Sequence, residues 1–429
     1  MLNIIYDATI MTNVFYKDSG RSGIFFVCQN ILNELVKRTD VKVFLYFAPE
    51  AFADGLRLQQ QFYPDVDCIQ DLPKYRLVRF LHRKFRYWYS TLYHHILLRK
   101  CISFGMSSCY AFFLMFLKNN VLKVRDCSAF FSPFYEIPKF FRKQQGLKSY
   151  ILIHDFIPLI YPQYYPKAPP FIARAMACAK DGSFFFFNSL YTMEDAKKLF
   201  PSLVKSNAMV THLAASENFK QIKDSVAFER IKKKYNIPDG KKYVFSLCTL
   251  EPRKNLIRAV RTFIQFLEKN NIKDLVWVMG GSAWVSFVQQ LKNDGVSWSE
   301  DVIVRSGYID DDDLSILYSN AEWFVYTSQY EGFGLPPLEA MQCGCPVITS
   351  NNSSLPEVVG DAGIMIDWDS DEQHIDAYEK YYFDENLRKE NGRRGMERSK
   401  KFSWDMTVAK MIDVMKKRTE KMENTGFYG

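Results

Sequence analysis

The strongest constraint on the fold is one stretch, Trp323 to Pro346, with the sequence WFVYTSQYEGFGLPPLEAMQCGCP. It begins with a short apolar run, Trp323–Tyr326, which is typical of a buried strand. After a polar turn, Leu335 and two prolines open a helix, because the N–H groups of a first helical turn need no partner inside the helix. Gly344 predicts the end of that helix, and the next strand follows. The stretch therefore predicts a strand–loop–helix–strand unit with glycines where the loop meets the helix.

The junction between this loop and this helix suits an anion. Free N–H groups and the positive end of the helix dipole point at one spot there, which favours a phosphate. Two carboxylates flank the spot, Glu331 in the loop and Glu339 one turn into the helix. Carboxylates beside an anion are repelled by it unless they accept hydrogen bonds from the same ligand. The hydroxyls of a sugar and of a ribose can donate such bonds. The residues alone therefore predict a sugar-nucleotide site.

The two glutamates, with seven residues between them, lie within EGFGLPPLEAMQCGCPVITSNNSSLPEVVGDAG. This segment resembles the signature of retaining glycosyltransferase family 4, which has the GT-B fold. The resemblance covers essentially all of the second half of the chain and is thinner in the first. It implies an α/β protein with two Rossmann-like doubly wound domains that face each other across a cleft.

The resemblance also implies the reaction. We expect a retaining, metal-independent hexosyltransferase whose co-substrate is a nucleotide diphosphate-sugar, GDP-mannose-like or another NDP-hexose, with no cofactor. The expected acceptor is a glycan or a lipid-linked acceptor in the biosynthesis of a surface polysaccharide such as a capsule or an O-antigen. TLEPRKN followed by EGFGLPPLEAM is more similar to mannosyl- and rhamnosyl-type enzymes than to others.

A chain of 429 residues is long enough for two domains. We expect an N-terminal acceptor domain over 1–218, with a basic, aromatic insertion at about 72–125, and a donor-binding domain over 219–403. The resemblance implies that the helix in 404–429 crosses back to the first domain. The strands predicted from apolar runs are Leu2–Ala8, Val41–Phe47, Ser128–Phe131, Ser149–Ile153, Ser183–Phe187, Met209–His212, Lys242–Leu247, Leu275–Met279 and Val302–Arg305. The predicted helices are Ile24–Lys37, Pro166–Ala179, Leu256–Lys269, Asp311–Ser319, Asp371–Phe383 and Trp404–Lys421.

Four residues are the catalytic candidates. Arg253 and Lys254 follow a predicted strand and open a helix, which places them at the carboxyl ends of a parallel sheet. The resemblance makes these two cations the clamp on the diphosphate, whose leaving group gains negative charge in the transition state. His154, in HDFIP, resembles the family's histidine near the donor sugar and the reacting bond. Glu331 resembles the residue that reads the sugar hydroxyls.

Glu339 resembles the residue that holds the ribose hydroxyls. Other donor contacts are implied where backbone N–H groups or glycines approach the ligand. These are Gly23, Gly307, Tyr308, Ile309, Phe333, Gly334 and Leu335. At the turn before Gly23, Ser22 replaces the family's first glycine, and Cys248 stands where relatives carry glycine or arginine, so no third cation comes from there.

An aspartate run and the cysteines could suggest a metal site, but both are better explained without one. The run Asp310–Asp313 precedes a predicted helix, and we expect these carboxylates to cap and complement its start. The nine cysteines have neither paired nor metal-like spacing, which favours free thiols in a reducing cytoplasm. Residues 1–7 read as a first buried strand rather than a signal peptide.

The net charge of +8 is concentrated in one segment. Residues 72–125 hold eleven Lys or Arg and no Asp or Glu, which leaves 45 basic against 48 acidic residues elsewhere. Aromatic residues lie between these cations, a pattern typical of a membrane interface that faces anionic lipid. The expected membrane-binding residues are Arg79, Arg83, Lys84, Arg86 and Trp88. We therefore expect a cytoplasmic protein, peripheral on the inner face of the plasma membrane; nucleic acid and a plain solvated face are the competing interpretations.

Two other function classes stay open. A GT-B epimerase or hydrolase would turn over the sugar nucleotide without an acceptor. A catalytically silent protein would bind the sugar nucleotide or dock on a membrane, and the intact set of Glu331, Glu339, Arg253, Lys254 and His154 argues against that class.

Overall fold

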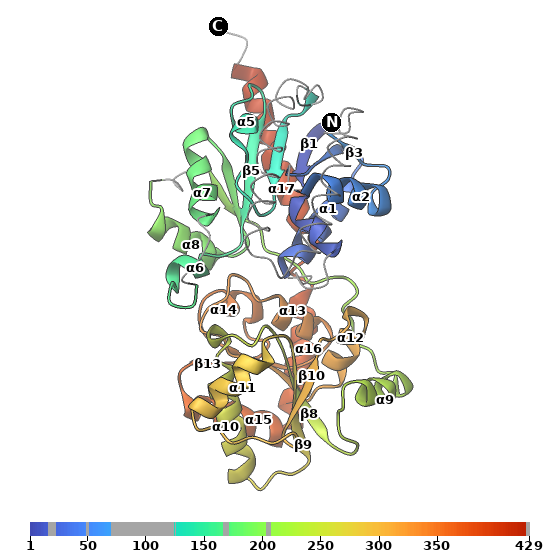
Figure 1. Cartoon of the computed structure of the whole chain (residues 1–429), viewed down its shortest axis with the longest axis vertical. Helices are drawn as coiled ribbons and strands as arrows, with labels where there is room; N and C mark the ends of the chain where they lie inside the picture. Colours follow the sequence, from blue (N-terminus) through green and yellow to red (C-terminus); the bar gives the residue numbers. More distant parts are fainter. Residues whose placement is uncertain are drawn as a thin grey trace, which may run out of the picture.

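The computed structural model describes residues 1–15, 23–48, 51–69, 124, 126–165, 171–202 and 207–425. The chain forms two α/β halves stacked end to end, the first blue to green and the second yellow to red in Figure 1. Each half is built on a parallel sheet flanked by helices. The expectation of two Rossmann-like halves is thereby confirmed.

The first sheet has seven strands in the order β3-β2-β1-β4-β5-β6-β7. All neighbouring strands run parallel, and Ile5 of β1 pairs with Phe44 of β2 and Phe130 of β4. These strands are apolar along their whole length because helices cover a parallel sheet, as in β6, where all four phenylalanines are buried. The strands are β1 Leu2–Asp7, β2 Val41–Tyr46, β3 Asp67–Cys68, β4 Ala129–Ser132, β5 Lys148–Ile153, β6 Phe184–Phe187 and β7 Ala208–Val210.

The second sheet has six strands in the order β10-β9-β8-β11-β12-β13, also all parallel. Its order reverses at β8, next to β11, and such a switch point is where open α/β sheets bind ligands. The strands are β8 Lys242–Leu247, β9 Leu275–Gly280, β10 Ile303–Gly307, β11 Trp323–Tyr326, β12 Val347–Ser350 and β13 Ile364–Ile366.

Helices connect the strands. In the first half they are α1 Gly23–Lys37, α2 Phe52–Phe62, α5 Lys139–Arg142, α6 Ile157–Ile160, α7 Phe171–Ala177 and α8 Leu190–Leu199. In the second half and beyond they are α9 Ser225–Lys234, α10 Leu256–Lys269, α11 Trp284–Asn293, α12 Asp311–Asn320, α13 Leu335–Gln342, α14 Leu355–Val359, α15 Asp371–Phe383, α16 Glu385–Ser399 and α17 Trp404–Thr425. Short 3-10 helices span Thr9–Phe15, Cys178–Asp181 and Pro252–Lys254.

The last helix, α17, leaves the second half and lies against the first sheet (Figure 1). The ammonium nitrogen of Lys416 lies 2.6 Å from an oxygen of Asp40, and Arg418 donates to Asn207 at 3.0 Å. Met411 and Met415 of the same helix are buried. The C-terminal helix thus contributes to the core of the N-terminal half.

The expectation for the aspartate run was right in part: Asp311, Asp312 and Asp313 lie in the first turn of α12, where they complement its dipole, but the expected capping bond is wrong. Asp310 is the residue before α12, but its side chain accepts no capping bond. Instead, Lys234 from the end of α9 pairs with Asp310 at 2.5 Å and also with Asp313, which accepts a bond from Tyr235. A lysine distant in the sequence therefore pairs with two of the four carboxylates that were expected to cap the helix start. Among the described residues, no group of three metal-ligating side chains comes together.

Several expectations fall outside the described residues. These are the membrane-binding set of Arg79, Arg83, Lys84, Arg86 and Trp88, the turn before Gly23, and the first part of the helix predicted over 166–179. Within the described ranges, every helix is too short or too polar to cross a bilayer.

Candidate active site at the junction of the two halves

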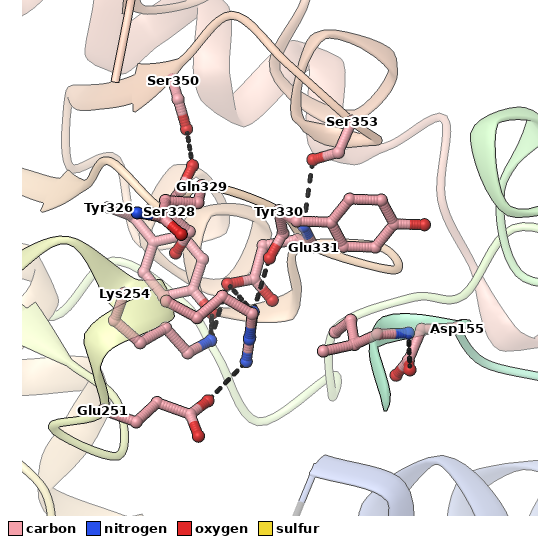
Figure 2. A network of polar contacts seen from close by, with 12 residues as sticks. Asp155, Glu251, Lys254, Tyr326, Ser328, Gln329, Tyr330, Glu331, Ser350 and Ser353 are labelled. Carbon is pink, nitrogen blue, oxygen red and sulfur yellow. Dashed lines mark hydrogen bonds and ion pairs between the residues drawn. The ribbon is translucent and has the colours of Figure 1, made fainter. Parts of the chain in front are cut away.

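The predicted strand–loop–helix unit forms as expected. β11 ends at Tyr326, the loop carries Glu331, and α13 starts at Leu335 with its prolines in the first turn. Beside it, the segment after β8 folds into the 3-10 turn that holds Arg253 and Lys254. Figure 2 shows Lys254 and Glu251 on one side of Glu331 and Ser353 on the other, with Asp155 approaching on a separate segment.

Arg253 and Lys254 are not free in this structure, because Glu331 pairs with both. Its Oε1 lies 2.6 Å from Nζ of Lys254 and 3.0 Å from Nη1 of Arg253. Lys254 also donates to the hydroxyl of Tyr326 at 2.6 Å, and Arg253 donates to Glu251 at 2.6 Å. Two cations and two carboxylates therefore form one charge-balanced cluster at the carboxyl end of the second sheet.

The cluster holds its charges strongly. Burial alone would raise the pKa of Glu331, but the charges of Lys254 and Arg253 outweigh it and lower that pKa to about 2. Burial opposes the charge of Arg253, yet Glu331 and Glu251 raise its pKa above the ordinary value. Glu331 and Arg253 therefore stay ionised at neutral pH, and a ligand that binds the cations must compete with Glu331.

The loop that carries Glu331 is fixed from the other side by the segment before α14. The N–H of Glu331 donates to Oγ of Ser353 at 3.0 Å. The hydroxyl of Ser354 donates to the carbonyls of Glu331 and Phe333, at 2.9 and 2.6 Å. These bonds hold the backbone of the loop while leaving the carboxylate to face the cations.

The start of α13 is open toward the first half. Gly334 precedes the helix with a φ of 116°, a conformation that favours glycine. In the part of the chain that the structure describes, nothing accepts a hydrogen bond from the N–H groups of Phe333, Gly334 or Leu335. A Cβ at Gly23, the first residue of α1, would lie 3.8 Å from Cδ1 of Leu335. The N-termini of two helices thus approach each other from the two halves, and both favour an anion.

Glu339 lies one turn further along α13, away from the cations. Its Oε2 accepts a hydrogen bond from the hydroxyl of Tyr318 at 3.1 Å. Burial raises the pKa of Glu339 to about 7, and the bond from Tyr318 only partly opposes this. Glu331 is therefore fully ionised near neutral pH, whereas Glu339 titrates in that range.

Gly307, the last residue of β10, and the two residues after it lie at the far end of the same sheet edge. Gly307 has a φ of 70°, and the side chain of Tyr308 is 74% exposed. Ile309 is buried against Gly280, where a Cβ would lie 2.5 Å from Cδ1 of Ile309. Because that side chain points into the core, only the backbone of Ile309 can contact a ligand.

His154 follows β5 in the first half. Its Nε2 lies 2.7 Å from the carbonyl oxygen of Pro133, which can only accept, so Nε2 carries the hydrogen and Nδ1 is left as an acceptor. Burial lowers the pKa of His154 to about 4. The imidazole is therefore neutral at physiological pH and is a weak base.

A cavity of about 240 Å³ lies between the halves. His154 and Asp155 line it from the first half, and Arg253 lines it from the second. The structure thus brings the predicted histidine and one of the predicted cations to one space, although 99 residues separate them in the sequence.

Polar contacts that the sequence did not predict join the two halves beside this cavity. The carbonyl of Gly332 accepts from the hydroxyls of Ser189 and Thr192 at 2.8 and 3.1 Å, and Tyr330 donates to Asp195. A Cβ at Gly332 would lie 2.1 Å from the carbonyl oxygen of His154, so only glycine fits. The helix α8 therefore holds the loop that carries Glu331.

A second contact of this kind involves Glu357 of α14. Its two oxygens lie 2.9 Å from the N–H of Leu190, and Oε1 lies 2.5 Å from Nε2 of His212. The one sequence signal for this region is Ser189 three residues before Thr192, a helix-capping pattern that the structure has as a bond of 3.0 Å to the N–H of Thr192. That pattern predicts the helix start and not its partner in the other half.

None of the cysteines in the described ranges forms a disulfide. Cys248, next to the cation pair, is neutral because burial raises the pKa of its thiol to about 12. It adds no charge to the cluster, which agrees with the expectation that no third cation comes from this position.

Comparison with known proteins shows which family the chain resembles. The profile of the family Glycosyl transferases group 1 matches residues 227–398. The O-antigen chain mannosyltransferase B of Escherichia coli is 30% identical over 289 residues, which cover 66% of this chain and 74% of that protein. The serotype-specific mannosyltransferase WbdA of Escherichia coli is 30% identical over 283 residues, which cover 62% of this chain and only 33% of WbdA.

Solved structures agree on the fold. Sucrose-phosphate synthase from Thermosynechococcus elongatus superposes with a TM-score of 0.65 at 16% identity, covering 98% of this chain and 100% of that one. WaaG, a glycosyltransferase involved in lipopolysaccharide biosynthesis, superposes with a TM-score of 0.59 at 14% identity, covering 97% and 99%. At these identities the likeness concerns the arrangement of two sheets and their helices.

Proposed function

The chain belongs to the group 1 glycosyltransferases and has their GT-B fold, and on this premise we propose that it transfers a mannosyl residue, with retention, from a nucleotide diphosphate-sugar to a glycan or lipid-linked acceptor in surface polysaccharide biosynthesis. The observation that carries the proposal is the buried cluster of Arg253, Lys254 and Glu331 at the open start of α13. Two relatives at 30% identity are mannosyltransferases, one of them of the O-antigen chain, which favours mannose among the hexoses.

In the proposed complex the diphosphate replaces Glu331 as the partner of Arg253 and Lys254. The β-phosphate gains charge as the sugar leaves, and two cations with helix N–H groups stabilise that charge in a buried site. Glu331, once displaced, accepts hydrogen bonds from sugar hydroxyls. Glu339 accepts bonds from the ribose hydroxyls, one turn further along α13.

We propose retention because the departing phosphate, rather than His154, is proposed to take the proton of the acceptor. His154 has a pKa of about 4, so it is better suited to accept a hydrogen bond from a sugar hydroxyl at Nδ1 than to remove a proton from the acceptor. In the proposed step the departing phosphate oxygen stays on the face where the acceptor hydroxyl attacks and takes its proton. The new bond then forms on the face from which the old one broke.

We also propose where in the cell the protein acts. The basic, aromatic segment 72–125 would bind the protein peripherally to the anionic inner face of a membrane and bring the site to a lipid-linked acceptor. This part rests on the sequence alone.

The donor site is tested with a panel of nucleotide sugars and two variants. GDP-mannose should raise the melting temperature most, and only the preferred donor should yield transfer. Arg253→Ala and Lys254→Ala should each lower kcat/KM by about a hundredfold, since each removes a donor to developing charge. The matched control is Arg258→Ala, an arginine paired with Asp371 on the neighbouring helix, which should stay near wild type. Near-wild-type kinetics in both site variants would refute the diphosphate assignment, and product formation without an acceptor would favour an epimerase or hydrolase.

A further inference from the structure

The cavity between the halves has two kinds of wall. One part of the wall is polar and carries His154, Asp155 and Arg253; we call it the mouth, because the proposed reaction takes place there. The rest of the lining, which we call the depth, belongs to the first half and is mostly apolar. The buried side chains there are Leu152, Ile157, Ile172 and Ala175.

Aromatic rings complete the apolar part. Phe134 and Phe171 both line the cavity, and their ring centroids lie 5.2 Å apart. Phe134 also lies 5.9 Å from the imidazole of His154, measured between ring centroids. Aromatic faces suit the C–H surface of a sugar ring, and the aliphatic depth behind them offers no hydrogen-bond partner from its side chains.

Such a wall discriminates between sugars. A hydroxyl pushed into it loses its hydrogen bonds to water and gains none, which is costly. A methyl group in the same place gains apolar contact. The cavity of about 240 Å³ is smaller than the usual pocket for a drug-sized molecule, which spans roughly 300–1,000 Å³, so it suits one sugar unit or part of one.

We propose that this cavity binds the acceptor through a methyl group on its terminal sugar, carried either by an acetamido group or by a 6-deoxy carbon. The inference rests on the proposed transferase function and specifies its acceptor. The methyl group contacts Ile172, Ala175 and Phe134, while the attacking hydroxyl stays at the mouth. There it lies beside His154 and Arg253, where the departing diphosphate is proposed to be.

The polar mouth supports this orientation. Asp155 already accepts from the N–H of Ile157 at 2.9 Å through Oδ1, which fixes its carboxylate at the entrance. The hydroxyl of Tyr165 donates to Glu251 at 3.1 Å and so joins the same rim to the second half. An acceptor with its hydroxyls at this rim and its methyl group inside makes hydrogen bonds at the polar part of the cavity and apolar contacts in the rest.

The experiment compares matched sugar pairs on the full chain. The free sugars N-acetylglucosamine and glucose differ by the acetamido group, and D-rhamnose differs from D-mannose only by its 6-deoxy carbon. The member with a methyl group should have an acceptor KM about tenfold lower in at least one pair. The pair that responds identifies the source of the methyl group.

Two variants on α7 locate the effect. Ala175→Leu fills the cavity from a buried position, whereas Ala173→Leu makes the same change on the exposed face of the same helix. The preference for the methyl-bearing sugar should disappear in the first variant and persist in the second. Affinity for the free nucleoside diphosphate and the melting temperature report whether Ala175→Leu still folds. If it does not, Ile172→Ala, which enlarges the cavity, should weaken the preference instead.

Equal KM values within both pairs in the wild type would overturn the proposal, as would a preference that survives Ala175→Leu. A failure of the transferase function itself is distinguishable, because saturation-transfer NMR reads binding without turnover. Strong saturation of the methyl resonance in the wild type and its loss in Ala175→Leu would support the site even if no product formed. No saturation of that resonance would reject it.

Discussion

The carboxylate of Glu331 lies 2.6 Å from the ammonium nitrogen of Lys254. An acidic residue thus occupies, in the free protein, one side of the place proposed for a diphosphate. The same oxygen lies 3.0 Å from Arg253, so one carboxylate neutralises part of the charge of both cations. Buried cations left without a partner are costly, and this pairing keeps the empty site stable.

The first prediction follows from that competition. Glu331→Ala should bind the free nucleoside diphosphate at least as tightly as the wild type, because the cations lose the carboxylate that they share. Transfer should slow by about a hundredfold or more, because contacts to the sugar are lost. Calorimetry and single-turnover kinetics measure the two effects.

The same variant should be less stable without ligand by about 3–5 kcal/mol, since two buried cations lose their carboxylate, and nucleotide should restore much of this. Denaturant unfolding with and without nucleoside diphosphate checks it. Weaker nucleotide binding than in the wild type would show that Glu331 supports the diphosphate site rather than competing with it.

A second prediction concerns pH and Glu339. Its raised pKa of about 7 means that the carboxylate is mostly protonated at pH 6 and mostly ionised at pH 8. Because the ionised form is the better acceptor for two ribose hydroxyls, nucleotide affinity should rise by about tenfold over this range.

The phosphates of the nucleotide also titrate, so the test compares the wild type with Glu339→Gln. The glutamine variant should lose this part of the pH dependence and keep whatever the phosphates contribute. Identical profiles for the two proteins would remove Glu339 from the ribose site.

The third prediction concerns Gly332, where the two halves touch. Gly332→Ala places a methyl group where 2.1 Å separates a Cβ from the carbonyl oxygen of His154. The halves must move apart, and overpacking of this kind costs about 1–3 kcal/mol, so kcat/KM should fall by about tenfold or more. Nucleotide affinity and the melting temperature serve as controls for the second half. Wild-type transfer rates would mean that the observed approach of the halves is not needed for the reaction.

Much of the fold could be predicted because it depends on local patterns. The strand at Trp323–Tyr326, the helix at Leu335 and most other strands follow from apolar runs and from proline and glycine positions. The two-sheet arrangement followed from the resemblance. The short helices α5, α6 and α14 were missed because four or five residues carry too little periodicity.

The sequence predicted which residues form the site, but it did not predict which of them contact each other. Arg253 and Glu331 are 78 positions apart, and their pairing depends on how β8 and β11 lie side by side. Asp195 and Glu357 were not predicted for the same reason, since each accepts a hydrogen bond from a residue in the other half. Lys234 explains the error at the aspartate run, because no local pattern reveals a cation that arrives from another helix.

A fourth prediction tests the basic segment. Changing Arg79, Arg83, Lys84 and Arg86 together to glutamine should lower co-sedimentation with anionic liposomes, because each engaged cation contributes on the order of 1 kcal/mol. Activity on a short soluble acceptor should stay nearly unchanged, and high salt should release much of the wild-type protein.

The matched control removes the same charge elsewhere. Lys389, Arg393, Arg394 and Lys400 lie exposed on α16 or just after it in the second half, and their change to glutamine should leave liposome binding intact. Equal sedimentation of the segment variant and the wild type at low salt would remove the membrane role. Loss of soluble-acceptor activity would instead mean that the segment supports the fold or the acceptor.

The most direct test of the account is the anomeric configuration of the first product. GDP-mannose labelled with carbon-13 at C1 is incubated with the protein and an acceptor, and NMR records the one-bond carbon–hydrogen coupling at C1 as the glycoside forms. We predict an α-linked product from the α-linked donor, formed in the wild type and slowed by about a hundredfold in Lys254→Ala. A β-linked first product, or release of free mannose with no glycoside, would contradict it.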